Sequence, residues 1–197
     1  MTRIRFSTIA ILLVSLFWSV AANADLVPDA DRLLSRVRVL TAPALAGRGS
    51  GSVELMSAAD TLADWLSQAG LVPAFDGAWF QDFDLTGQGW TGNELSGLQD
   101  RNVAGIMLGE GELAGRYVVI GAHFDHLGRL VPAAGSAPPP GAQDYYPGAN
   151  DNASGVTVVC ELMALMRDRT ALVRNRRSVL IVFFCRGRSG SARQWVF

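Results

Sequence analysis

The strongest constraint on the fold is a strand, helix and strand pattern in the second half of the chain. Residues 117–122 and 178–184 are apolar runs, and residues 152–167 between them carry apolar side chains at helical spacing. The second run lacks polar alternation, which is typical of a central strand in a sheet that is covered on both faces. Two strands joined through a helix form a β-α-β crossover. The sequence therefore predicts an α/β fold with three layers, α/β/α.

Earlier segments supply further elements of such a fold. Helical spacing of apolar residues predicts one helix over residues 29–40 and a second that Ser52 caps and Gly70 ends. Strands are predicted over residues 79–85 and 102–108, where aromatic and β-branched residues concentrate.

The composition is that of an ordinary globular domain. Apolar residues make up 49% of the chain, charged residues make up 18%, and the net charge is −1. These values exclude a disordered chain and indicate no basic surface for nucleic acid. The two cysteines, Cys160 and Cys185, have a spacing that suggests no disulfide framework.

Residues 1–24 have the pattern of a secretory signal. Arginines precede an apolar run over residues 9–20, and Ala-Asn-Ala at residues 22–24 matches a cleavage site. The run is too short to span a bilayer, although an uncleaved membrane anchor is the alternative. We expect an exported protein, periplasmic or secreted, whose residues 25–197 form one domain.

Candidate metal ligands gather where the first strand of the crossover ends. His123 and Asp125 follow that strand, and Asp151 stands at the entrance to the helix. Zinc takes imidazole nitrogen and carboxylate oxygen, and rigid elements must deliver them. His123 and Asp151 are therefore candidate metal ligands, and the Asp151 carboxylate could bridge two ions about 3.5–4 Å apart. Asp125 is the type of partner that orients a ligating imidazole.

These two segments resemble the signatures of a known family. His-Phe-Asp-His-Leu-Gly at residues 123–128 and Gly-Ala-Asn-Asp-Asn-Ala-Ser-Gly at residues 148–155 resemble those of the co-catalytic two-zinc aminopeptidases, a bacterial leucyl aminopeptidase-like family related to glutaminyl cyclase. The resemblance implies a mixed central sheet and two zinc ions in an intact active site. It makes His123 a terminal zinc ligand, Asp125 the catalytic carboxylate that orients it, and Asp151 the bridge.

His126 is expected to be a loop residue near the site, because the family takes its other histidine ligand from far downstream. Residues 25–197 would then be the N-terminal part of such a domain, which would be incomplete at the C-terminus.

The resemblance implies a zinc-dependent metalloexopeptidase, an aminopeptidase that removes N-terminal residues from peptides by metal-activated water. Its partners would be peptide substrates with a free N-terminus, with no nucleic acid and no membrane contact after signal cleavage. A non-catalytic peptidase-like binding module and a glutaminyl cyclase-like acyltransferase are the alternatives on the same fold. The oligomeric state is left open.

The chain departs from the family pattern after residue 184. The family continues with a Glu-Glu pair, in which the first glutamate is the general base and the second is a zinc ligand, but Gly187 and Arg188 stand here. Glycine cannot transfer a proton, and arginine would repel a dication. We therefore expect this chain to be inactive.

A shift of one base would explain the departure. One set of codons for residues 185–197, read one base later, encodes the Glu-Glu pair and a Leu-Leu-Gly-Ser segment in register with the family. We expect a reading-frame error in the gene or its record, and a naturally divergent terminus is the alternative.

Overall fold

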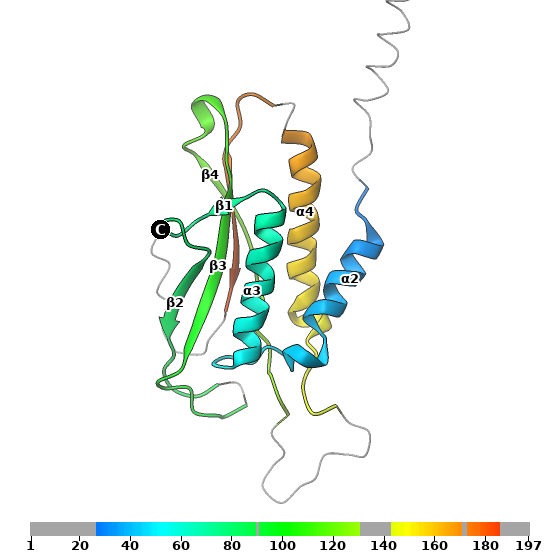
Figure 1. Ribbon diagram of the computed structural model, residues 1–197, viewed down its shortest axis with the longest axis vertical. Helices are drawn as coiled ribbons and strands as arrows, with labels where there is room; N and C mark the ends of the chain where they lie inside the picture. Colours follow the sequence, from blue (N-terminus) through cyan, green and yellow to red (C-terminus); the bar gives the residue numbers. More distant parts are fainter. Residues whose placement is uncertain (1–26, 90, 131–142, 171–172, 186–197) are drawn as a thin grey trace, which may run out of the picture.

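The computed structural model describes residues 27–89, 91–130, 143–170 and 173–185 (Figure 1). The predicted signal over residues 1–24, most of the loop that was predicted to join the two metal segments, and the divergent residues 186–197 lie outside these ranges.

A mixed sheet forms the centre of the described structure. Its strands are β1 (Val72–Pro73), β2 (Phe80–Asp84), β3 (Gln99–Met107), β4 (Tyr117–His123) and β5 (Ser178–Phe184). The central strand β5 pairs parallel with β4 and antiparallel with β3. Both β1 and β2 pair antiparallel with successive stretches of β3, on the edge that β5 does not use. The mixed sheet implied by the resemblance is confirmed.

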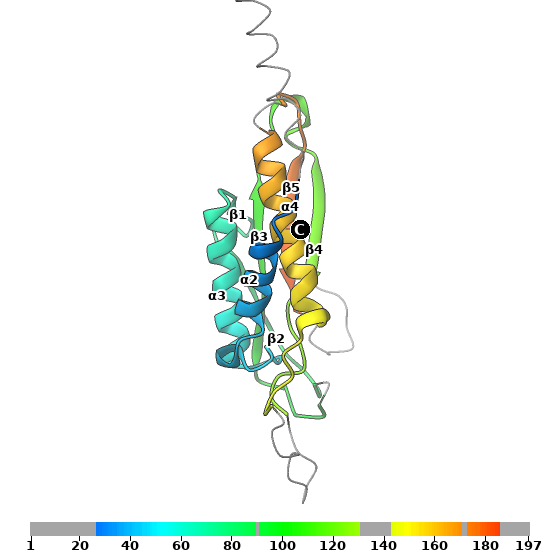
Figure 2. The same ribbon diagram turned by 90° about the vertical axis from the view of Figure 1, so that its right-hand side faces the viewer.

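Three α-helices lie on one face of this sheet, two of them against the strands and the first against the last helix (Figures 1 and 2). They are α2 (Ala30–Leu40), α3 (Val53–Gln68) and α4 (Ser154–Thr170), and the short turns are η1 (Pro43–Leu45), η2 (Gly111–Leu113) and η3 (Ala149–Ala153). As predicted, Ser52 caps α3, since its hydroxyl accepts a 3.1 Å hydrogen bond from the Leu55 amide. The described residues thus supply two of the three expected layers. None of their helices is long and apolar enough to cross a membrane.

The parallel pair β4 and β5 is joined through α4, which confirms the predicted β-α-β crossover. The helix begins later than predicted, because Asp151 and Asn152 have non-helical backbone angles. The Asn152 side chain then accepts a hydrogen bond of 3.2 Å from the Gly155 amide, as a helix cap does.

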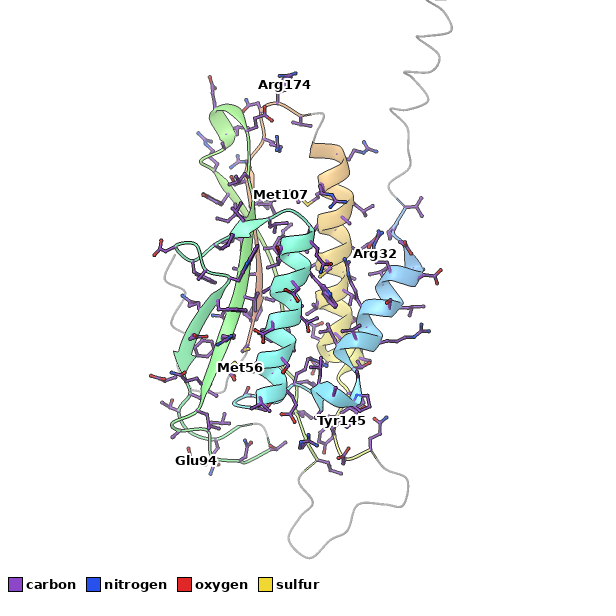
Figure 3. The ribbon with its side chains drawn as sticks, in the orientation of Figure 1. Arg32, Met56, Glu94, Met107, Tyr145 and Arg174 are labelled. Atoms are coloured by element: carbon purple, nitrogen blue, oxygen red, sulfur yellow. The ribbon has the colours of Figure 1, made fainter. Side chains whose placement is uncertain are left out.

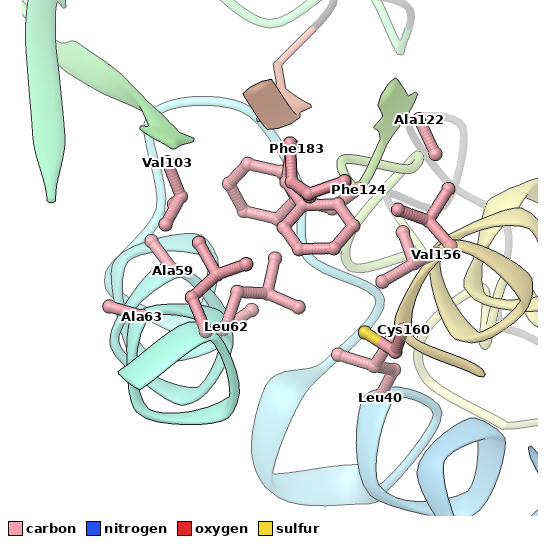
Figure 4. Packing of buried hydrophobic residues seen from close by; sticks show 14 of the residues in the cluster. Leu40, Ala59, Leu62, Ala63, Val103, Ala122, Phe124, Val156, Cys160 and Phe183 are labelled. Atoms are coloured by element: carbon pink, nitrogen blue, oxygen red, sulfur yellow. The ribbon is translucent and has the colours of Figure 1, made fainter. Parts of the chain in front are cut away.

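The core between sheet and helices fixes the segment that follows β4. Phe124 and Phe183 are fully buried beside each other, with Leu62 of α3 and Val156 of α4 in the same cluster (Figure 4). The Phe124 amide also donates a 3.0 Å hydrogen bond to the carbonyl of Phe184, which extends the pairing of β4 with β5 by one residue. Burial of Phe124 therefore holds the backbone between His123 and Asp125 in one place.

Candidate metal-binding site

The site lies at one end of the sheet, where β4 ends and the chain enters α4. His123 is the last residue of β4, and Asp151 lies in the turn η3 that precedes the helix. Because β4 and β5 are parallel, the carboxyl ends of both strands meet there, a common place for a ligand site in α/β folds. Tyr145 lies at the same end of the molecule (Figure 3) and donates a hydrogen bond of 3.4 Å to the Thr41 carbonyl.

His123 faces a carboxylate with each of its ring nitrogens. Nε2 lies 3.2 Å from Oδ1 of Asp151, and Nδ1 lies 3.3 Å from Oδ1 and also 3.3 Å from the backbone oxygen of Asp125. The contact with the Asp125 carboxylate raises the pKa of His123, and the charge of Asp151 adds to this rise, while burial opposes it. The structure therefore brings all three predicted site residues together.

Asp151 presents its carboxylate to solvent. Its side chain is 65% exposed, whereas that of Asp125 is 4% exposed. The neighbouring Asn152 ties this turn to β4, since its side-chain amide donates a 3.2 Å hydrogen bond to the His123 carbonyl. Asp151 is thus held beside His123 and remains accessible from outside.

His126 contacts the other oxygen of the same carboxylate. Its Nδ1 lies 3.5 Å from Oδ2 of Asp151, and its ring meets that of Tyr146 edge to face at 6.5 Å. Burial lowers the pKa of His126, which the charge of Asp151 partly offsets. The sequence placed His126 near the site but did not predict this contact, because no local pattern links it to the turn at Asp151.

Arg48 lies beneath the site and was not singled out from the sequence. Its side chain is fully buried, burial lowers its pKa to about 10, and the charges of Asp125 and Asp151 oppose that shift. Its position between two glycines, just before the helix α3, is a signal in the sequence that could have indicated it.

A cavity of about 200 Å³ opens beside His126. The N-terminus of α3, the loop after β2 and the segment after β4 line it, and an ion pair of 2.6 Å between Glu54 and Arg129 spans part of the wall. Polar side chains such as Ser50 and Asn93 contribute to the lining. The surroundings of the candidate ligands can thus accept a small polar group.

The donor atoms present fit one edge of a zinc site. Two ligand atoms on neighbouring corners of a zinc tetrahedron are about 3.3 Å apart, close to the separation of His123 Nε2 and Asp151 Oδ1. Asp125 on the far side of the imidazole supplies the carboxylate that usually orients such a ligand. Among the described residues, however, no group of three or more histidine, cysteine or acidic side chains is placed to hold an ion. These residues supply part of a metal site.

One protein family and several solved structures are similar to this chain. The model of peptidase family M28 matches residues 102–186. A search of curated proteins gave no significant match. The chain is similar to the solved structures of a glutaminyl cyclase from Bacteroides thetaiotaomicron bound to N-acetylhistamine and a Zn-dependent exopeptidase from Parabacteroides distasonis. Each has a TM-score of 0.55, with 23% and 22% identity, and in each the match covers 80% of this chain and 46% of the other.

A leucine aminopeptidase precursor from Bacteroides thetaiotaomicron has a TM-score of 0.52 at 20% identity, and the match covers 80% of this chain and 47% of that one. At these identities the structural likeness shows the fold. The chain spans a little under half the length of these structures. The family match and the shared fold confirm the predicted resemblance to aminopeptidases and glutaminyl cyclases.

Proposed function

We propose that this chain is the N-terminal part of an exported, zinc-dependent exopeptidase that acts on the free N-terminus of peptides. The observation that supports the proposal most strongly is the placement of His123 between two carboxylates, Asp125 on Nδ1 and Asp151 on Nε2. This is the donor set of a ligating imidazole with its orienting carboxylate and a neighbouring anionic ligand. The match of peptidase family M28 to residues 102–186 is consistent with it.

Each residue has a distinct role in this proposal. His123 offers Nε2 to a zinc ion, because Asp125 faces Nδ1 and favours the tautomer that carries its proton there. Asp151 offers both oxygens, and its exposure leaves room for a second ion and for substrate. Two zinc ions, when bound, would polarise the peptide carbonyl and make water more acidic.

The chain's own residues also shape the surroundings of the reaction. Phe124 is fully buried and holds the ligand segment rigid. The helix α4 begins at Ser154, three residues after Asp151, so a packed helix supports the turn that carries this carboxylate. The cavity beside His126 offers polar groups to the part of a peptide that does not react.

The test uses the protein expressed from its own locus, with the downstream sequence included. We expect about two zinc ions per chain and hydrolysis of aminoacyl-anilides, both lost in Asp151→Asn. Cyclisation of N-terminal glutamine without hydrolysis would support a glutaminyl cyclase-like acyltransferase instead. Absence of zinc and of both activities would support a non-catalytic binding module.

A further inference from the structure

Arg48 connects three segments that meet at the candidate site. Its Nε donates a 2.8 Å hydrogen bond to the carbonyl of Phe124, and its Nη2 donates one of 3.1 Å to that of Gly148. Its Nη1 donates to the carbonyls of Leu40 and Pro147, the latter at 3.1 Å. One side chain therefore joins the end of α2, the backbone just after His123 and the backbone that leads to Asp151.

Each of these acceptors is a backbone carbonyl. Burying a guanidinium costs several kcal/mol unless its donors are satisfied, and four carbonyls satisfy Arg48 without a contact ion pair. The planar fork of arginine reaches acceptors in several directions at once, which the single ammonium group of lysine cannot do. The contacts thus depend on the shape of the side chain as well as on its charge.

The backbone on both sides of Arg48 also packs directly against the segments after β4 and before η3, because the flanking residues are glycines. A Cβ on Gly47 would lie 2.3 Å from the Tyr146 carbonyl oxygen, and one on Gly49 would lie 2.9 Å from Cα of Gly128. The Arg48 carbonyl in turn accepts a 3.0 Å hydrogen bond from the amide of His126. Three stretches that are distant in sequence are therefore in direct backbone contact at Arg48.

We propose that Arg48 is a positioning residue for the two candidate metal ligands, His123 and Asp151. By holding the carbonyls of Phe124 and Gly148, it sets the distance between the end of β4 and the turn η3, so that His123 Nε2 and Asp151 Oδ1 face each other. This inference rests on the proposed zinc-binding function. It adds that the Gly-Arg-Gly segment before α3 determines the ligand geometry without touching a metal or a substrate.

The test compares Co²⁺ binding by the full chain with Arg48→Lys, Arg48→Met and a control, Arg32→Met. Arg32 lies between α2 and α4, away from the site (Figure 3), where its Nε donates a 2.6 Å hydrogen bond to Glu161. We expect both Arg48 variants to bind Co²⁺ about 10- to 100-fold more weakly and with an altered visible spectrum. Arg32→Met should lose stability but keep the affinity and spectrum of the unchanged protein.

A measurement without metal separates this inference from the proposed function. The imidazole NMR signals of His123 and His126 should shift in Arg48→Lys and stay unchanged in Arg32→Met. If the 197-residue chain binds no Co²⁺, these imidazole signals decide the role of Arg48, and the zinc proposal is tested separately on the protein expressed with its downstream sequence. Arg48 variants with unchanged affinity, spectrum and imidazole signals would overturn the positioning role, and so would a failure of both variants to fold.

Discussion

Nε2 of His123 lies 3.2 Å from Oδ1 of Asp151, although β4 carries one residue and the turn before α4 carries the other. The two side chains face each other because β4 ends, and the turn before α4 lies, at the same end of the sheet. Asp125 lies on the opposite side of the imidazole, where it faces Nδ1, so that Nε2 is the nitrogen directed at Asp151. This relationship leads to the first prediction.

We predict that the 197-residue chain binds zinc weakly and below a stoichiometry of two per chain, because His123 and Asp151 are too few ligands for two ions. Asp151→Asn should abolish binding, and Asp125→Asn should weaken it about 10- to 100-fold. Asp144→Asn, an exposed aspartate that pairs with Arg129, is the matched control. Calorimetry that found two tight sites in this chain would contradict the prediction.

The same binding should depend on pH. Asp125 raises the pKa of His123, so the ring keeps its second proton to a higher pH than a free histidine does. Zinc competes with that proton for Nε2, and its affinity should therefore fall as the pH drops through this raised pKa. Titrations at several pH values check this, and an affinity that did not decline in acid would argue against Nε2 as a ligand.

Phe124→Ala should lower the free energy of unfolding by about 3–5 kcal/mol, because it leaves a cavity in the centre of the core. It should also weaken metal binding, since the backbone between His123 and Asp125 loses its anchor. Val158→Ala, at a position of α4 that is 59% exposed, should change stability by less than about 0.5 kcal/mol. Urea denaturation of the three proteins measures the difference, and equal losses would show that Phe124 is not a packing anchor.

Asp100 should make the chain less stable as pH rises. Burial raises its pKa to about 7, the charge of Asp125 adds to the rise, and the hydrogen bond from the Gly51 amide opposes it. The folded state therefore holds a proton that the unfolded state releases near pH 4, and stability falls between these two values.

From pH 5 to pH 8 the free energy of unfolding should fall by roughly 2.5 kcal/mol through this residue, and Asp100→Asn should remove that loss. Chemical denaturation of both proteins at the two pH values gives the comparison. Parallel pH profiles for the two proteins would refute the assignment, because every other titrating group is common to both.

The edge of β4 should promote self-association. The central strand β5 is paired on both sides, so its edges are not open to another chain. Among the described strands, β4 forms one edge of the sheet, since it pairs only with β5, and Tyr117, Val118 and Val119 are exposed there. An exposed apolar edge can pair with the edge of another chain.

Val119→Lys should therefore increase the monomer fraction in sedimentation experiments. Val158→Lys adds the same charge at a position of α4 with almost the same exposure, 59% against 58%. It should leave self-association unchanged. An equal rise of the monomer fraction in both variants would indicate a general effect of charge instead of an effect of the strand edge.

The sequence alone determined the elements and caps that depend on residues close together in the chain. Apolar periodicity gave the strand, helix and strand order, and Ser52 marked the start of α3, because these signals act within one or two turns of the chain. The positions of His123, Asp125 and Asp151 at element ends followed from the same local patterns. The short strand β1 was missed, since two residues carry no periodicity.

Only the tertiary structure decided which of these residues meet. The contact of His126 with Asp151, the burial of Arg48 among four carbonyls and the open edge of β4 all join segments that are far apart in sequence. The late start of α4 also depends on such a contact, since Asn152 bonds to the carbonyl of His123. Packing of the sheet against the helices sets these distances, and no pattern within a single segment encodes them.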